Sequence, residues 1–320
     1  MSTEPSYEPR TDRTNHTATP VLAVTYERYG DPRGIPVVLL HGFPYDIRAY
    51  DEVAAALAAT GGFDVYVPFL RGFGATHFAS GSDPRSGQQG ALGQDLLDFI
   101  DVLGLDRPVV AGYDWGGRAA CIVAALWPER VRGLVSVGGY NIQDIARAAV
   151  EPTKPEWEAT YWYQYYFHSE RGRRGLEQNR EELCELLWRT WSPEWTGASE
   201  AFKASAMSLH NPAFVDVVVH SYRHRYGLAE GDPRYQGIED RLAAAPPIGV
   251  PTVVLDSGAD GVGGPTFAES GDRESFTGWL EVRHLPGIGH NVPQEAPEAF
   301  AEAVRAVARA STTGTADSAD

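Results

Sequence analysis

An acidic residue stands between two glycines in the segment VVAGYDWGGR, residues 109–118. The apolar start predicts a strand and the rest continues a helical pattern, so Asp114 is expected on the sharp turn between them. Glycines at 112 and 116 would let the two backbones approach closely. A carboxylate, with a reference pKa of about 3.9, is an anion at neutral pH and can attack an electrophile without a base. We therefore interpret Asp114 as a candidate nucleophile, although an aspartate here more commonly serves as a helix N-cap.

The loop HGFP, residues 41–44, directly follows a predicted buried strand. Loops at the carboxyl ends of parallel strands gather at one edge of a sheet and form binding sites there. When the nucleophile lies on a strand–turn–helix, such a loop supplies one backbone N–H to an oxyanion hole, and the residue after the nucleophile supplies the other. We expect the amides of Phe43 and Trp115 to be these donors. Taken alone, the loop would also fit a plain Gly-Pro turn.

A histidine follows the last predicted strand in the segment LPGIGHN, residues 285–291. Histidine is the side chain whose ordinary pKa suits proton transfer near neutral pH. Most histidines are satisfied surface or core residues, but small neighbours and a position after a strand would let His290 reach the nucleophile. We predict that His290 is a general base.

The carboxylate that orients this histidine is expected on the loop after an earlier strand, and DSGAD, residues 256–260, follows the predicted strand 251–255. Asp256 still belongs to the strand end, whereas Asp260 lies within the loop and can turn toward His290. We therefore predict Asp260, with Asp144 as the alternative. The resulting chain order of nucleophile, acid and histidine is that of α/β-hydrolases.

Strands and helices alternate in the first part of the chain, which predicts an α/β fold with a doubly wound, mostly parallel sheet. Strands are expected at 21–29, 35–40, 64–69, 108–113 and 133–137, and helices at 47–60, 91–103 and 115–127. Residues 142–235 are rich in aromatics with helical periodicity and no clear strand, before strands at 251–255 and 280–285 and a helix at 297–310. These patterns predict a core of 20–141 and 236–310, an inserted helical cap of 142–235, and disordered tails of 1–19 and 311–320.

The chain of 320 residues has 43 acidic and 27 basic residues and a formal charge of −16. This charge disfavours nucleic acid and anionic membranes, so the expected partner is a small molecule. Cys121 and Cys184 lack disulfide or metal-ligand spacing, and no apolar run has the length of a signal peptide or membrane span. We expect a cytoplasmic protein without a metal or cofactor, and the sequence leaves open whether it is a monomer or a homodimer.

Together, the H-G-x-P loop, the G-x-D-W-G-G turn and the late G-x-G-H resemble the epoxide hydrolase branch of the α/β-hydrolase fold, over roughly residues 21–310. The resemblance implies a hydrolase that opens an epoxide to a vicinal diol. The epoxide would form an ester on Asp114, and water activated by His290, which Asp260 orients, would hydrolyse that ester. Haloalkane and haloacetate dehalogenases share the aspartate nucleophile, so a dehalogenase is one alternative, and a non-catalytic binding protein on the same fold is another.

Epoxide hydrolases of this type carry two cap tyrosines that hold the epoxide oxygen, and this resemblance points to Tyr163 and Tyr222. A phenol can donate to the alkoxide that develops when an epoxide opens. Tyr165 or Tyr166 could replace Tyr163 if the cap helix is rotated, and we expect Tyr166 to contact substrate. The other aromatic residues nearby are interpreted as cap core.

Two positions bear on the choice between epoxide and halogenated substrates. Haloalkane dehalogenases tend to have asparagine where Phe43 stands, although the Trp115 indole could hold a halide. Haloacetate dehalogenases resemble this chain at Arg118, an arginine that binds substrate carboxylate, but they also have arginine in place of Trp115. We favour Arg118 as a helix-face residue paired with a nearby acid, which predicts neutral epoxides as the better substrates. Arginines 171, 173 and 174 are interpreted as solvated cap surface.

Overall fold

The computed structural model describes residues 12–313. Its centre is a nine-stranded sheet. Eight strands follow the order β1-β2-β4-β3-β6-β7-β8-β9, and the ninth, β5, pairs with Leu22 and Ala23 at the start of β2. Strands β3, β4, β6, β7, β8 and β9 run parallel, whereas β1, β2 and β5 form antiparallel pairs. The strands are β1 Thr14–Ala18, β2 Leu22–Gly30, β3 Ile35–Leu40, β4 Phe63–Pro68, β5 His77–Phe78, β6 Val109–Gly112, β7 Gly133–Val137, β8 Thr252–Ser257 and β9 Leu280–Leu285.

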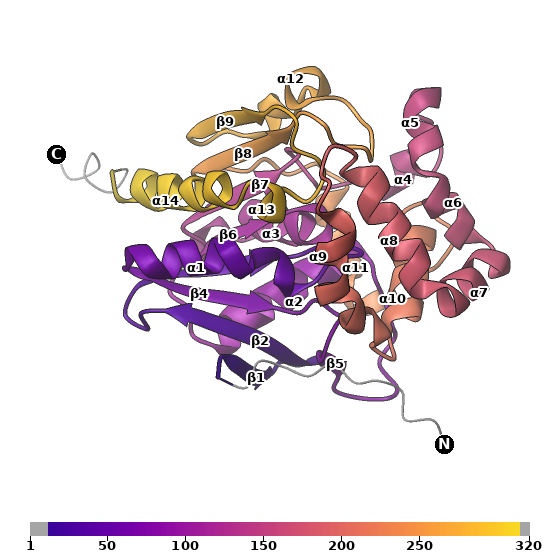
Figure 1. The fold of residues 1–320 in the computed structure, drawn as a ribbon, viewed down its shortest axis with the longest axis horizontal. Coiled ribbons are helices and arrows are strands. Elements are labelled where there is room, and N and C mark those ends of the chain that lie inside the picture. Colours follow the sequence, from indigo (N-terminus) through magenta and orange to yellow (C-terminus); the bar gives the residue numbers. More distant parts are fainter. Residues whose placement is uncertain (1–11, 314–320) are drawn as a thin grey trace.

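Helices cover both faces of this sheet (Figure 1). α1 (Asp51–Thr60) packs with α14 (Pro297–Thr313) on one face, and α2 (Gln89–Val102) packs with α3 (Asp114–Leu126) on the other. The central strands β3 and β6 are almost entirely apolar and nearly inaccessible to solvent because helices cover them on both sides. These layers confirm the predicted doubly wound α/β fold.

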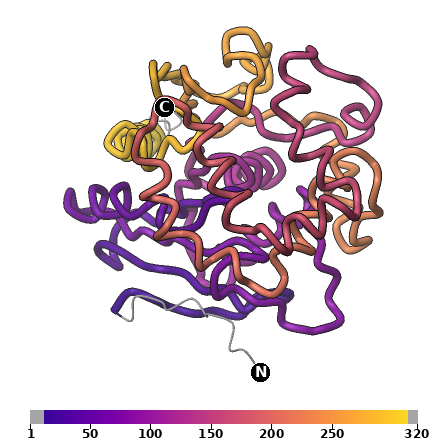
Figure 2. Tube along the Cα trace, turned by 45° about the vertical axis from the view of Figure 1, so that its right-hand side comes forward, coloured from indigo at the N-terminus to yellow at the C-terminus, as the bar shows by residue number. Residues whose placement is uncertain are grey.

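The helical insertion lies between β7 and β8 and forms one side of the molecule in Figure 1. In Figure 2, where the view is turned by 45°, the insertion passes in front of the core. The indole of Trp188 donates a 2.9 Å hydrogen bond to the carbonyl of Pro44, so the insertion contacts the loop at the carboxyl end of β3. Its helices are α4 Ile145–Ala148, α5 Pro155–Thr160, α6 Trp162–His168, α7 Glu170–Gln178, α8 Arg180–Trp191, α9 Ala198–Ser205, α10 Phe214–His224 and α11 Gln236–Leu242.

Short helical elements complete the chain. The helix predicted from residue 47 begins as the 3₁₀ turn η1 and continues as α1. Two short helices follow β8 and β9 on the way to α14. The elements are η1 Ile47–Tyr50, η2 Pro128–Arg130, η3 Ala206–His210, η4 Pro233–Tyr235, η5 Asp272–Ser275, α12 Phe267–Ser270 and α13 Val292–Glu295.

Both predicted tails need correction where the structure describes them. The prediction of disorder over residues 1–19 is wrong for Thr14–Ala18, which forms β1 and pairs antiparallel with β2. An outer strand needs no apolar run, because its backbone hydrogen bonds to one neighbour while its side chains face solvent. The prediction for 311–320 is wrong at residues 311–313, which continue α14. The predictions for 1–11 and 314–320 lie outside the described residues.

Candidate active site

Asp114 lies on a tight turn between β6 and α3 with a positive φ of 50°. A non-glycine residue in this left-handed region costs on the order of 1–2 kcal/mol, so the surrounding contacts must hold it there. Two glycines make those contacts possible. A Cβ on Gly116 would lie 2.0 Å from the carbonyl oxygen of Leu40, and one on Gly112 would lie 2.5 Å from the backbone of Gly116. Strand, turn and helix can therefore pack at this distance only without side chains.

Backbone amides hold the carboxylate of Asp114. The Phe43 amide donates a 2.7 Å hydrogen bond to Asp114 Oδ1, and the Trp115 amide also hydrogen-bonds to the carboxylate. Burial favours the neutral acid, but the imidazole of His290, the charge of Arg225 and the amide hydrogen bond together keep the pKa of Asp114 below its ordinary value. The side chain is thus an anion, and the two amides predicted to form an oxyanion hole lie against it.

His290 lies between two carboxylates. Its Nδ1 is 2.9 Å from Asp260 Oδ2, and its Nε2 is 3.7 Å from Asp114 Oδ2. Burial would lower the pKa of His290, but the charge of Asp260, with further contributions from the hydrogen bond to Asp260 and from Asp114, outweighs it and raises the pKa to about 10. The imidazole is therefore protonated at neutral pH and faces the ionised carboxylate of Asp114.

The two other aspartates that were considered for this role lie elsewhere. Asp256 accepts a hydrogen bond from the Phe267 amide and pairs with His284 on β9. Asp144 is the N-cap of α4, where its side chain accepts from the Arg147 amide. The structure thus brings Asp260, and neither alternative, to the histidine.

The insertion holds the loops that carry Asp260 and His290. The backbone carbonyl of Trp191, the last residue of α8, accepts hydrogen bonds from the amides of Gly261 at 2.9 Å and His290 at 3.1 Å. Next to it, Ser192 Oγ accepts from the His290 amide and donates to Glu295, whose carboxylate also accepts from the Gly289 amide. Sequence reasoning missed Ser192 and Glu295, since no local pattern shows that they meet.

Two tyrosines from the insertion lie near the nucleophile, because both rings pack against Phe43, whose amide holds Asp114. Tyr163 on α6 and Tyr222 on α10 are both buried, and their ring centroids are 5.3 Å apart. Burial raises the pKa of each phenol, and the charge of Asp114 raises it further, so both stay protonated donors. The Tyr163 hydroxyl accepts a 2.9 Å hydrogen bond from Gln164, and the Tyr222 hydroxyl has no hydrogen-bond partner within residues 12–313.

The neighbouring tyrosines do not share this position. The Tyr166 hydroxyl packs so closely against Gly175 of α7 that a Cβ there would lie 1.9 Å from it. The expectation that Tyr166 contacts substrate is therefore wrong in this structure, because its side chain leans toward α7. Tyr165 is exposed and bonds to Glu158 on α5.

A cavity of about 620 Å³ opens beside Asp114, Tyr163 and His290. Arg118 and Arg225 also line it, and sequence reasoning missed Arg225. Arg118 was expected to pair with an acid, and this is wrong: its Nη1 donates to the amide oxygens of Gln89 at 3.1 Å and Gln143 at 3.3 Å. No residue within 12–313 forms an ion pair with it.

Over residues 12–313, no group of three or more His, Cys, Asp or Glu side chains is arranged to hold a metal ion. In the same range, no helix has the length and apolar character needed to cross a membrane. Cys121 and Cys184 are both buried free thiols.

Comparison with known proteins shows the family. The family described as alpha/beta hydrolase fold matches residues 35–297, so the chain belongs to that family. A crystal structure from Klebsiella pneumoniae, of a protein provisionally assigned as an epoxide hydrolase, is 43% identical with a TM-score of 0.90, covering 93% of this chain and 98% of that one.

Curated relatives include both kinds of enzyme that the sequence resembles. Bifunctional epoxide hydrolase 2 of Sus scrofa is 34% identical over 160 residues, which are 49% of this chain and 28% of the relative. Haloalkane dehalogenase 2 of Mycobacterium bovis is 34% identical over 102 residues, 32% of this chain and 34% of the relative. The matches thus span about a third or less of these two relatives. These similarities confirm the resemblance to the epoxide hydrolase branch and its dehalogenase relatives.

Proposed function

We propose that this chain is an epoxide hydrolase that forms a covalent ester on Asp114. The observation that carries the proposal is the presence of two protonated phenols, Tyr163 and Tyr222, near an ionised aspartate that is also contacted by a histidine. A nucleophilic aspartate with a histidine and its orienting carboxylate could react with many kinds of electrophilic substrate. Two phenols, in contrast, suit an epoxide, because they can donate to a leaving oxygen that stays attached to the substrate. The Klebsiella structure and the Sus scrofa relative support the same class of enzyme.

In the first step, an oxygen of the Asp114 carboxylate attacks an epoxide carbon and the carbon–oxygen bond of the ring breaks. The electron pair of that bond goes to the oxygen, which takes a proton from Tyr163 or Tyr222 as the alkoxide develops. The product of this step is a hydroxyalkyl ester of Asp114. No external base is needed, because the nucleophile is already an anion.

After the first step, the proton that His290 carries in the free enzyme passes through solvent to the tyrosinate, which leaves a neutral imidazole. In the second step, water attacks the carbonyl carbon of the ester while Nε2 of His290 takes its proton. Asp260 accepts from Nδ1 and stabilises the imidazolium that forms. The amides of Phe43 and Trp115 donate to the tetrahedral oxyanion. Collapse of this intermediate breaks the bond from the carbonyl carbon to the substrate oxygen. That oxygen takes the remaining proton of the attacking water, so the diol leaves and the Asp114 carboxylate and the protonated His290 of the free enzyme are restored.

A single turnover in ¹⁸O-water with enzyme in excess tests this sequence. The diol should take its new oxygen from Asp114, and ¹⁸O should appear in the peptide that contains Asp114. His290→Ala should still be alkylated and should accumulate an adduct with the mass of enzyme plus intact epoxide, whereas Asp114→Ala should form none. Label entering the diol directly in the first turnover would overturn the assignment of the nucleophile.

A dehalogenase that uses the same aspartate is the second candidate. The indole Nε1 of Trp115 is buried without a hydrogen-bond partner inside the described range, and an N–H in that state could bind a halide ion. Release of halide from haloacids or haloalkanes at rates above those of epoxide opening would favour this candidate. Epoxide turnover without halide release would exclude it.

A further inference from the structure

Two arginines line the cavity beside the nucleophile without a carboxylate partner. Arg118 donates through Nη1 to two glutamine side chains, and its buried Nε has no hydrogen-bond partner among the residues described. Arg225 is half-buried, and its guanidinium carbon lies 4.8 Å from the ring centroid of Tyr222 and 5.8 Å from that of Trp115. Within the same range, no acid forms an ion pair with Arg225.

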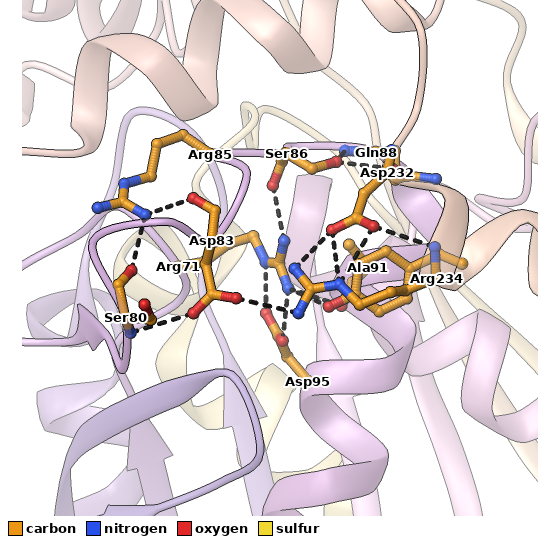
Figure 3. Close-up of polar contacts among 11 residues, drawn as sticks. Arg71, Ser80, Asp83, Arg85, Ser86, Gln88, Ala91, Asp95, Asp232 and Arg234 are labelled. Carbon is orange, nitrogen blue, oxygen red and sulfur yellow. Dashed lines mark hydrogen bonds and ion pairs between the residues drawn. The ribbon is translucent and has the colours of Figure 1, made fainter.

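The two arginines that are almost fully buried in the described part of the chain, Arg71 and Arg48, are both neutralised by acids. Arg71 is almost completely buried and holds Asp95 through two 2.6 Å hydrogen bonds (Figure 3). Arg48, also buried, pairs with Glu27. A guanidinium removed from water needs such a partner because burial disfavours its charge. Arg118 differs from both, since it faces an open cavity where a partner could enter.

The acids that line the same cavity already have partners. Asp114 and Asp260 share His290, Asp256 pairs with His284, and Asp272 accepts a hydrogen bond from a backbone amide. None of them forms an ion pair with either arginine. The two positive charges therefore remain available to a group that enters from solvent.

The positive charges of Arg118 and Arg225 also repel each other. Burial, reinforced by the positive charge of Arg225, lowers the pKa of Arg118 to about 9. The guanidinium remains charged at neutral pH, but its charge is less stable than in water. A negative group placed near both arginines would relieve this repulsion.

Sequence spacing places the arginines next to the reacting groups. Arg118 follows Asp114 by four residues on α3, and residues four apart lie on the same side of a helix. Arg225 directly follows α10 and is three residues after Tyr222. Arg118 is thus close in sequence to the nucleophile, and Arg225 is close in sequence to one of the two phenols.

We propose that Arg118 and Arg225 form an anion-binding subsite and that the substrate is an epoxide that carries a carboxylate. This inference rests on the proposed epoxide hydrolase function and replaces the expectation, drawn from the sequence, that neutral epoxides are the better substrates. A planar guanidinium can bind a carboxylate through two parallel hydrogen bonds, which would fix the epoxide relative to Asp114.

The kinetic test uses two epoxides that differ only in an acid and the corresponding primary carboxamide. The wild type should favour the acid about tenfold or more in kcat/KM, since charged hydrogen bonds contribute at least that much when formed in an enclosed site. Arg118→Met and Arg225→Met should each lose at least tenfold on the acid, mostly through KM, and less than threefold on the amide. Arg174→Met removes an exposed positive charge from the cap away from the cavity and should behave as the wild type.

A binding measurement separates this inference from the reaction itself. Calorimetric titration with butyrate and with butyramide should show tighter binding of butyrate to the wild type and loss of that preference in both cavity variants. Epoxide turnover with equal loss on acid and amide would overturn the subsite while leaving the proposed function standing. Arginine-dependent binding of butyrate with no epoxide turnover would instead reject the proposed function and support the subsite.

Discussion

His290 Nε2 lies 3.7 Å from Asp114 Oδ2, beyond the length of a hydrogen bond but close enough for ion pairing. In the free enzyme this charge helps to keep the imidazole protonated, and a protonated imidazole cannot act as a base. Formation of an ester at Asp114 removes that negative charge, so the pKa of His290 must fall. The first step of the proposed reaction would thus prepare the base for the second.

We expect Asp260→Asn to slow ester hydrolysis at least about a hundredfold, because an amide cannot stabilise the imidazolium that forms when His290 takes a proton from water. Alkylation of Asp114 should change less than tenfold. Rapid quench followed by mass spectrometry of the intact protein would resolve the two steps. Asp144→Asn retains an N-cap on α4 and provides the control. Equal slowing of both steps would contradict the assigned role of Asp260.

Tyr163→Phe and Tyr222→Phe should each slow alkylation about tenfold or more, since general acids commonly contribute on the order of a hundredfold. Hydrolysis of the ester should be spared. Pre-steady-state measurement of adduct formation reports the first step directly. Tyr166→Phe removes a hydroxyl that lies against α7, so it should keep the wild-type rate. Wild-type alkylation in both Tyr163→Phe and Tyr222→Phe would refute the role of the phenols.

Protonation of His290 should also make stability depend on pH. Its pKa is about 10 in the folded chain and about 6.5 when unfolded, so the folded state holds an extra proton between these values. The stabilisation is complete below about pH 6.5 and is lost as the pH rises toward 10, with a slope near 1.4 kcal/mol per unit. Urea unfolding at several pH values should show this slope in the wild type and its loss in His290→Gln.

His284→Gln is the matched control for that experiment, because it removes a half-exposed imidazole on β9 and leaves His290 in place. Its free energy of unfolding should follow the wild-type slope. An unchanged slope in His290→Gln would show that the imidazole is not protonated in the folded chain at neutral pH.

Gly42→Ala should abolish most of the activity, because its Cβ would lie 2.4 Å from both Cβ and Oδ1 of Asp114. Moving the aspartate would also disturb its hydrogen bond with the Phe43 amide, and overpacking of this kind costs about 1–3 kcal/mol. Activity assays and thermal unfolding would measure both effects. Gly237→Ala, in α11, where the new Cβ would meet no atom within 4 Å beyond its own stretch of helix, should retain activity and stability.

Sequence reasoning located the parts of the site that depend on local signals. The glycines around Asp114, the buried strand before it and the loop position of Asp260 are all short-range features. Tyr163 and Tyr166 could not be separated, because residues three apart share one side of a helix and only α7 determines which one leans away. Arg225 could not be assigned, since its proximity to Asp114 arises from the contact between cap and core rather than from local spacing.

The carbonyl of Trp191 ties an inserted helix to the two loops that bear Asp260 and His290. Any rotation of α8 that breaks one of these hydrogen bonds strains the other. Substitutions in the cap that shift α8 would therefore also displace the loops that carry the acid and the histidine. A chimaera that receives its insertion from another member of the family would have to supply a carbonyl at this point. Without it, the acid and the histidine would lose a shared anchor even though every residue of the core was unchanged.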